Sequence, residues 1–348
     1  MGDTMLALQK HVAGPGAKLI EAPVPKIGPL DVLIEVKATS ICGTDLHIYD
    51  WDPWAQSRIK PPLIFGHEMA GEIIEVGSHV QGFQVGDHVS AETHIACGHC
   101  FQCRTGNAHI CESVKILGVD TQGVFAEYVS LPAANAWKNP KSIPHDIATA
   151  QEPLGNAVHT VFDGPVTGQR IAIWGCGPIG ICAAALCKAS SADLVIAVDI
   201  NDFRLNLAKE MGADYIFNPE RDDVIKEIKN LTNGKGADAF LEMSGNPKAF
   251  VDGLKATRAG GRASILGVFP TKIEVDVTKE IVFKGIRLHG INGRLMYDTW
   301  YKASSLLRNG KVKLEKIITH KFKMSEFEKA FQTLKGPSAG KIVLYPGK

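Results

Sequence analysis

Three residue types that bind catalytic zinc stand close together early in the chain. Cys42 lies in Ile-Cys-Gly-Thr, and His67 and Glu68 follow in Phe-Gly-His-Glu. One thiolate, one imidazole and one carboxylate are typical of a catalytic zinc, which keeps a further position open for water or substrate. Glu152 is a further candidate ligand or a proton acceptor beside this metal. Taken singly, each residue also has an ordinary alternative role as a core cysteine, a loop histidine or a solvated acid.

A run of four cysteines forms a second metal signal, and its members fall within fifteen residues: Cys97, Cys100, Cys103 and Cys111. Four thiolates fill the tetrahedral shell of a structural zinc, which stabilises a loop and leaves no position open to substrate. An iron–sulfur cluster and free thiols are the alternatives that this spacing leaves open. Since the chain has eight cysteines and we expect a reducing compartment, disulfides are not predicted. The neighbouring His94, His99 and His109 are predicted to lie on the surface.

A glycine-rich turn provides the cofactor signal. Gly175, Gly177 and Gly180 follow a predicted strand and open a predicted helix, the context that the dinucleotide fingerprint requires. The first glycine makes the turn, the second lets pyrophosphate approach the backbone, and the third packs helix against strand. Asp199 ends the next predicted strand, 19 residues after Gly180, where an acid binds the adenosine ribose and repels a 2′-phosphate. The turn therefore predicts NAD rather than NADP, and the alternative is a turn that binds no cofactor.

Two different patterns of apolar runs must position these motifs. Up to residue 150, runs such as Val32–Val36 and Gly71–Val76 are separated by glycine and proline turns, which predicts a β-rich domain. From Arg170 onward, apolar strands alternate with helices, which predicts a doubly wound parallel sheet and an α/β fold class. The predicted strands of this sheet are Ile171–Trp174, Leu194–Val198, Tyr215–Phe217, Ala239–Leu241, Ala263–Leu266 and Ile286–Gly290.

Length and composition fit a two-domain protein that binds a small molecule. A chain of 348 residues, 45% hydrophobic and 22% charged, is too long for one ordinary core. We predict domains at residues 1–150 and 151–294, with residues 295–348 returning to complete the first. The net charge of +1 and the lack of long charged or apolar runs predict neither a nucleic-acid nor a membrane partner. Because Met1–Lys10 lacks a signal-peptide pattern, we expect a cytoplasmic protein.

The zinc motif resembles that of a known family. The pattern Gly66-His67-Glu68-x2-Gly71-x5-Gly77-x2-Val80 is similar to the signature of the zinc-containing medium-chain alcohol dehydrogenases, and the cysteine loop and dinucleotide turn follow in the same order. This resemblance implies a GroES-like catalytic domain, a Rossmann domain, one catalytic and one structural zinc per subunit, and a homotetramer. Within the family, the chain most resembles the members that oxidise L-threonine, in segments such as Thr39–Tyr49, Trp51–Pro62 and Gln151–Val158.

The resemblance also implies a role for each matching residue. The positions that match ligands of the catalytic zinc are Cys42, His67 and Glu68. Thr44 and His47 match a proton relay, and Glu152 matches a residue that supports catalysis near the metal. Besides the three glycines, the positions that match NAD contacts are Ile179, Asp199, Arg204, Leu266, Gly267, Val268, Ile291 and Asn292.

The reaction implied by the resemblance is a zinc-assisted hydride transfer. Zinc would bind the C3 hydroxyl of L-threonine and lower its pKa, and the proton would leave through Thr44, the nicotinamide ribose and His47. The hydride would pass to NAD and give L-2-amino-3-oxobutanoate, the substrate of a possible downstream 2-amino-3-oxobutanoate lyase. A related polyol or 2,3-butanediol dehydrogenase is one alternative, and a zinc protein that binds the nucleotide without catalysis is another. Trp51, Trp54 and Arg294 either shape the substrate or cofactor site or make ordinary packing contacts.

Overall fold

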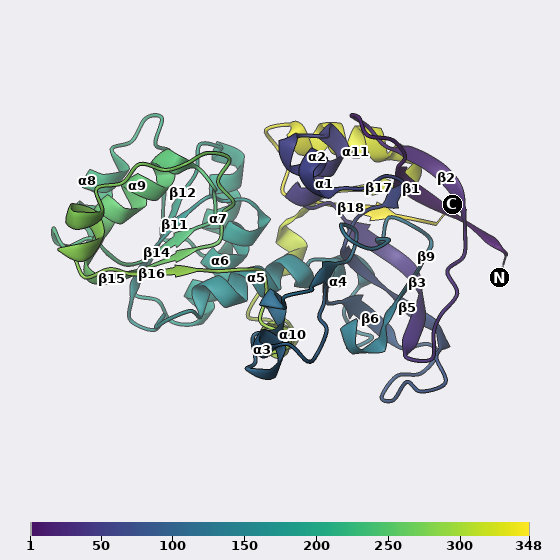
Figure 1. Ribbon diagram of the computed structural model, residues 1–348. Coiled ribbons are helices and arrows are strands. Elements are labelled where there is room, and N and C mark those ends of the chain that lie inside the picture. The colour runs from purple at the N-terminus through teal and green to yellow at the C-terminus, as the bar shows by residue number, and fades with distance from the viewer. Residues whose placement is uncertain (1, 348) are drawn as a thin grey trace. The chain divides into compact units, whose positions relative to one another are not determined.

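The computed structural model describes residues 2–347 and divides the chain into two compact units (Figure 1). Unit 1 comprises Met1–Glu152 and Ile318–Lys348, and unit 2 comprises Pro153–Ile317. Residues 295–317, which the sequence placed with the first domain, therefore fold with unit 2. One contact that ties this segment to unit 2 is the hydrogen bond from Lys316 Nζ to the Glu210 carbonyl, at 3.3 Å.

Unit 1 is the β-rich part of the chain. Its larger sheet has the order β10-β6-β5-β3-β18-β17, with β9 paired to β3 outside this path, and a smaller sheet has the order β2-β1-β4. The strands of the larger sheet are β3 (Asp31–Ser40), β5 (Glu68–Val76), β6 (His88–Ala91), β9 (Tyr128–Pro132), β10 (Ala136–Lys138), β17 (Ile318–Lys323) and β18 (Lys341–Tyr345). Those of the smaller sheet are β1 (Thr4–Lys10), β2 (Lys18–Pro23) and β4 (Leu63–Ile64).

Unit 1 also contains short helices, some of which pack on its apolar core. They are α1 (Gly43–Asp50), α2 (Pro53–Arg58), α3 (Phe101–Arg104), α4 (His145–Thr149) and α11 (Phe327–Lys335). Ile48 of α1 and Phe331 of α11 are buried in one cluster with Phe65 and Phe125. The ring of Tyr49 stacks on Phe331 with centroids 4.3 Å apart. Apolar burial of this kind fixes α1 in place, although α1 itself has only eight residues.

Unit 2 is a six-stranded parallel sheet with the order β13-β12-β11-β14-β15-β16, which confirms the predicted doubly wound fold. The strands are β11 (Arg170–Trp174), β12 (Leu194–Val198), β13 (Tyr215–Phe217), β14 (Ala237–Glu242), β15 (Thr257–Ile265) and β16 (Arg287–Gly290). The helices are α6 (Pro178–Ala189), α7 (Asp202–Met211), α8 (Val224–Leu231), α9 (Pro247–Ala256) and α10 (Asp298–Arg308), and α5 (Gln151–Val161) precedes the sheet.

The central strand β11 shows why its sequence is continuously apolar. Ala172 and Trp174 pack in one core cluster with Phe240, whereas the alternate residues Ile171 and Ile173 point to the opposite face and are also fully buried. Helices cover both faces of such a sheet, so no strand face is left for polar residues. Among residues 2–347, no helix is both long enough and apolar enough to cross a bilayer.

Candidate functional site

Strand pairing brings the mixed zinc ligands together in unit 1. Cys42 follows β3 and is the N-cap of α1, and Glu68 is the first residue of β5. In the antiparallel pair β3–β5, Ser40 lies opposite Glu68, so the carboxyl end of one strand meets the beginning of the other. As a result, one ligand atom each from Cys42, His67 and Glu68 lie within 4.8 Å of one another. This triad is called the mixed cluster below.

The surroundings of the mixed cluster are rich in negative charge. Burial by itself disfavours a charged imidazole, but Asp45, Cys42 and Glu152 outweigh burial and raise the pKa of His67 to about 10. The Nδ1 of His67 is 3.6 Å from Asp45 Oδ1, and the Cys42 N–H donates to Asp45 Oδ2 at 2.8 Å. A buried site that favours positive charge and offers sulfur, nitrogen and oxygen donors suits a divalent zinc ion.

Glu68 has a partner that the sequence did not reveal. The Nζ of Lys341, in β18, lies 2.7 Å from both carboxylate oxygens of Glu68 and donates at 3.1 Å to the Ile41 carbonyl. The hydroxyl of Ser40 also donates to Glu68. Both Glu68 and Lys341 are buried, and Glu68 and Cys42 raise the pKa of Lys341 above its ordinary value although burial opposes this. Glu68 is therefore both a possible ligand and one half of a buried ion pair.

The residues matched to the proton relay lie along α1. Thr44 Oγ1 is 3.8 Å from Cys42 Sγ, and His47 follows three residues later, on the same side of the helix. The ring of His47 is largely exposed, and its Nδ1 is 2.6 Å from Asp52 Oδ2. Glu152 is buried at the beginning of α5, where its charge acts on His67. The structure thus places Thr44 and Glu152 near the mixed cluster and leaves His47 accessible to solvent.

The four cysteines also converge in unit 1. One sulfur from each of Cys97, Cys100, Cys103 and Cys111 lies within 4.8 Å of the others, and all four thiols are free. The Cys97–Cys103 and Cys100–Cys111 sulfur distances are 4.0 and 3.8 Å. A zinc tetrahedron with Zn–S bonds of about 2.3 Å has edges of about 3.8 Å, which fits one ion rather than a multi-iron cluster. This quartet is called the thiolate cluster.

Backbone groups prepare the thiolate cluster for a metal. The Cys97 sulfur accepts a hydrogen bond from the Cys100 N–H at 3.4 Å, and Cys111 accepts one from the Cys97 N–H at 3.3 Å. Together with the N–H of His99, the Cys100 N–H lowers the pKa of Cys97 to about 6. Thiolates are the form that binds zinc, so the lowered pKa of Cys97 favours metal binding, whereas burial and the thiol of Cys100 raise the pKa of Cys103 to about 12.

Two of the histidines beside the thiolate cluster are not surface residues. His94 and His109 are buried, whereas His99 is exposed as predicted. The Nδ1 of His94 is 2.6 Å from Glu92 Oε1, and Asn135 donates to the backbone carbonyls of both residues. The prediction failed because it weighed these histidines only as metal ligands, and for His94 the contact from Asn135 comes from more than forty residues further along the chain.

The glycine turn in unit 2 has the geometry that phosphate binding requires. Gly175 has φ of 97°, and a side chain on Gly180 would begin 1.8 Å from the Gly175 carbonyl oxygen. A Cβ on Gly177, by contrast, would meet nothing within 4 Å. Gly177 is also the N-cap of α6 and offers no side-chain cap, so the first-turn N–H groups keep their capacity for an anion.

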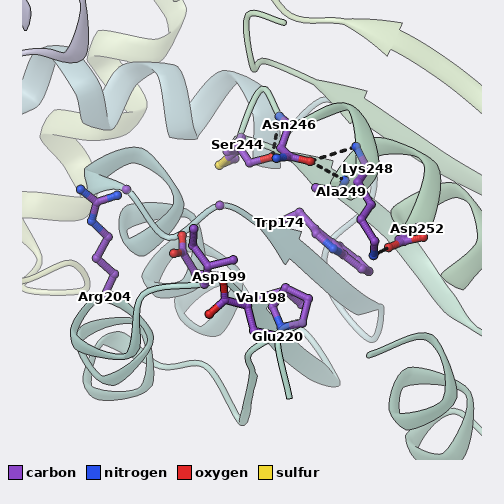
Figure 2. Close-up of a pocket in the computed structure, with 15 residues that line it drawn as sticks. Trp174, Val198, Asp199, Arg204, Glu220, Ser244, Asn246, Lys248, Ala249 and Asp252 are labelled. Carbon is purple, nitrogen blue, oxygen red and sulfur yellow. Dashed lines mark hydrogen bonds and ion pairs between the residues drawn. The ribbon is translucent and has the colours of Figure 1, made fainter. Parts of the chain in front are cut away.

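A pocket of about 530 Å³ lies beside this turn and includes Gly175, Gly177, Asp199 and Arg204 in its lining. In Figure 2, Asp199 and Arg204 lie toward one end of the pocket. The carboxylate of Asp199 accepts N–H groups from Cys176 at 2.6 Å and Asn201 at 2.8 Å, which fixes its orientation. The pocket therefore combines open space over a glycine with a fixed acid at the end of β12, as an adenosine site requires.

The other predicted cofactor residues lie at the carboxyl ends of neighbouring strands. Leu266, Gly267 and Val268 follow β15, and Ile291 and Asn292 follow β16. They are outside the lining of the pocket, and Ile179 is outside it as well. Ligands of parallel α/β sheets bind at this end of the strands, so the location is consistent with cofactor contacts.

Sequence reasoning missed part of the pocket lining, which Figure 2 shows opposite Arg204: Trp174, Ser244, Asn246, Lys248, Ala249 and Asp252. The side chain of Asn246 caps α9 by accepting the N–H groups of Lys248 and Ala249. A signal for this wall was present, because Gly245-Asn-Pro247 combines a strand end, an N-cap residue and proline at the first helical position.

Comparisons with known proteins agree with this geometry. Residues 28–141 match the alcohol dehydrogenase GroES-like domain, and residues 178–309 match the zinc-binding dehydrogenase family. L-threonine 3-dehydrogenase of Pyrococcus horikoshii is 54% identical over 344 residues, which cover 99% of each chain. A Sinorhizobium meliloti structure described as a zinc-binding dehydrogenase bound to NADP has a TM-score of 0.92 at 27% identity, covering 99% of this chain and 100% of that one. The 2R,3R-butanediol dehydrogenase of Bacillus subtilis has a TM-score of 0.89 at 30% identity, with the same coverage.

Proposed function

This chain belongs to the zinc-containing medium-chain alcohol dehydrogenase family, and on that premise we propose that it oxidises the C3 hydroxyl of L-threonine with NAD. The products are L-2-amino-3-oxobutanoate, NADH and a proton. The observation that carries the chemistry is the mixed cluster of Cys42, His67 and Glu68, whose sulfur, nitrogen and oxygen donors are typical of a catalytic zinc site. The choice of substrate is supported by the full-length similarity to the Pyrococcus enzyme.

The residues of the mixed cluster fit zinc by the chemistry of their donors and by the negative charge around His67. Zinc bound there supplies a Lewis acid that makes the alcohol hydroxyl more acidic. Thr44, beside Cys42, accepts the released proton, and His47 carries it toward water. Asp45 orients His67, and Lys341 holds the carboxylate of Glu68. Glu152 adds negative charge near the metal and supports catalysis there.

For the thiolate cluster we propose a structural zinc, since four sulfur donors leave no position for substrate. The distances between the sulfurs support this assignment. The division of labour proposed here gives unit 1 the catalytic role and unit 2 the cofactor role. The metal of the thiolate cluster then contributes to stability and not to turnover.

For the cofactor we propose NAD in preference to NADP. The carboxylate of Asp199, held by two N–H groups at the end of β12, would repel a 2′-phosphate. Because the Sinorhizobium relative was solved with NADP, the preference needs a direct test. In Asp199→Gly, the ratio of kcat/KM with NAD to kcat/KM with NADP is expected to fall at least tenfold.

We further propose that the protein works in the cytoplasm as a homotetramer and passes its product to a 2-amino-3-oxobutanoate lyase. The resemblance of the whole chain to the family supports these proposals. Light scattering of the purified protein tests the tetramer, and a dimer or monomer at working concentration would contradict it.

The decisive experiment measures NADH formation from L-threonine, D-threonine, serine, sorbitol and 2,3-butanediol, with zinc content determined on the same sample. We expect L-threonine to give the highest kcat/KM. The second candidate substrate is 2,3-butanediol, favoured by the similarity to the Bacillus butanediol dehydrogenase. If the diol or sorbitol exceeds L-threonine in kcat/KM, the proposed substrate is wrong although the chemistry stands.

A further inference from the structure

Asp52 contacts His47 of the proton relay, although the proposed function gives Asp52 no role. Its Oδ2 lies 2.6 Å from His47 Nδ1, while its Oδ1 accepts the Ala55 N–H at 2.9 Å. The first contact joins α1 to α2, and the second makes Asp52 the N-cap of α2. One carboxylate therefore fixes the beginning of α2 and one nitrogen of the histidine ring at the same time.

The chain between the two helices is shaped to bring Asp52 back to His47. Trp51 ends α1 in the left-handed region at φ of 59°, and the Asp52 N–H points to the His47 carbonyl at 3.4 Å. Lys10 Nζ lies over the Trp51 ring, 5.2 Å from its centroid. The ring of Trp54, in α2, approaches His47 at a centroid distance of 6.0 Å. The position of His47 is thus set from α2 and the turn before it, as well as from its own helix.

The charge of Asp52 determines which nitrogen of His47 carries the proton. Desolvation opposes ionisation of Asp52, but hydrogen bonds from Ala55 and His47 lower its pKa below the ordinary value. An ionised carboxylate accepts only, so a neutral His47 must place its hydrogen on Nδ1. The lone pair of Nε2 is then available to take up a proton. Because the pair is partly exposed, 58% for His47 and 31% for Asp52, it adds little to folding stability.

We propose that Asp52 is a positioning residue of the proton relay, which holds His47 as the Nδ1–H tautomer with Nε2 as the proton acceptor. This inference rests on the proposed function. The proton lost from the alcohol hydroxyl passes through Thr44 to Nε2, the imidazolium is paired with the Asp52 carboxylate, and Nε2 then releases the proton to water. This step transfers only a proton and changes no oxidation state, since the two electrons of the oxidation pass to NAD with the hydride.

Asp52→Asn tests the proposal with little risk to the fold, because asparagine caps helices as well as aspartate does. We expect kcat with L-threonine to fall about tenfold, with KM within about twofold and the melting temperature and zinc content unchanged. The matched control is Asp223→Asn, since Asp223 is the exposed N-cap of α8, accepts the Lys226 N–H, and contacts no histidine ring among residues 2–347. That control is expected to leave kcat unchanged.

A double-mutant cycle separates positioning from a general structural effect. In a His47→Gln background, Asp52→Asn is expected to change kcat by less than about twofold, because its effect acts through His47. A tenfold loss that persists in this background would overturn the proposal, as would an unchanged kcat in Asp52→Asn alone.

A readout independent of turnover is the ¹⁵N spectrum of the histidine ring, with His47 assigned by difference from His47→Gln. We expect an Nδ1–H signal in the unmodified protein and its loss or mixing with Nε2–H in Asp52→Asn. The same tautomer in both proteins would contradict the inference. If L-threonine is not oxidised but another alcohol is, the proposed substrate is wrong. The role of Asp52 can still be decided, by comparing kcat of the unmodified protein and of Asp52→Asn with that alcohol and by comparing their ¹⁵N spectra.

Discussion

The thiolate cluster and the mixed cluster both lie in unit 1, but the chain builds them from segments of very different length. All four sulfurs of the thiolate cluster come from one stretch of fifteen residues and are supported by N–H groups of that stretch. The mixed cluster joins residues 42, 67 and 68, and Lys341 of β18 holds one of them. The thiolate cluster can form when one loop adopts its turns, whereas the mixed cluster forms only when the strands of the sheet have paired. The mixed cluster is therefore expected to control turnover, and the thiolate cluster the stability of its own loop.

The largest expected effect is on turnover, in Cys42→Ser. Loss of a ligand from the mixed cluster should lower kcat at least about a hundredfold and reduce zinc from two atoms to one per chain, because a complete set of metal-binding side chains then remains only in the thiolate cluster. NADH formation and metal analysis measure both quantities. Cys187→Ala, a buried cysteine outside both clusters, is the control and should keep both zinc atoms. Two zinc atoms in an inactive Cys42→Ser would show that Cys42 is not a ligand.

The next effect is on stability, in Lys341→Met. Removing the buried ammonium leaves Glu68 charged without its partner, which should lower the free energy of unfolding by about 3–5 kcal/mol. Lys335→Met is the matched control, because Lys335 pairs with Asp50 at the exposed surface and should cost less than about 1 kcal/mol. Denaturant unfolding measures the difference. Similar losses in the two variants would mean that burial of the Glu68–Lys341 pair has no special importance.

A smaller effect is expected in Cys100→Ser, which removes one ligand of the thiolate cluster. The zinc of this cluster should be lost and the melting temperature should fall by several degrees, while kcat of the folded fraction stays within about threefold. Thermal unfolding, metal analysis and active-site titration of the folded protein provide the readouts. A fully stable variant without turnover would reverse the roles assigned to the two clusters.

The smallest effect concerns acid sensitivity away from both metals. Burial and the neighbouring His145 lower the pKa of His88 to about 4, and the two rings are 4.3 Å apart. Because the pKa in the folded state lies below that of the unfolded chain, the stabilising contribution is complete above pH 6.5 and is lost as pH falls toward 4. His88→Gln should therefore lose less stability than the parent between pH 6.5 and 4.5. Unfolding measured across this range checks it, and parallel curves would show that His88 does not contribute to the acid sensitivity.

Local sequence patterns were sufficient for the elements and for the local sites. The strands at 194–198 and 215–217 were predicted with their observed bounds, because apolar runs and the turn residues that bound them act within a few residues. The glycine turn was predictable for the same reason, since φ at Gly175 and the close approach at Gly180 are properties of the turn itself. The fold class and the convergence of the four cysteines followed from such signals.

Contacts over long separations were decided by the tertiary structure alone. Lys341 reaches Glu68 across 273 residues, and no spacing in the sequence relates them. Asn135 donates to the carbonyls of Glu92 and His94 from more than forty residues away, and the side of the pocket formed by Ser244 and Asn246 depends on the order of the parallel strands. The sequence by itself determined which residues have the chemistry to bind zinc and a dinucleotide. Packing determined which charges those residues face, because electrostatic energies depend on distance and burial rather than on position along the chain.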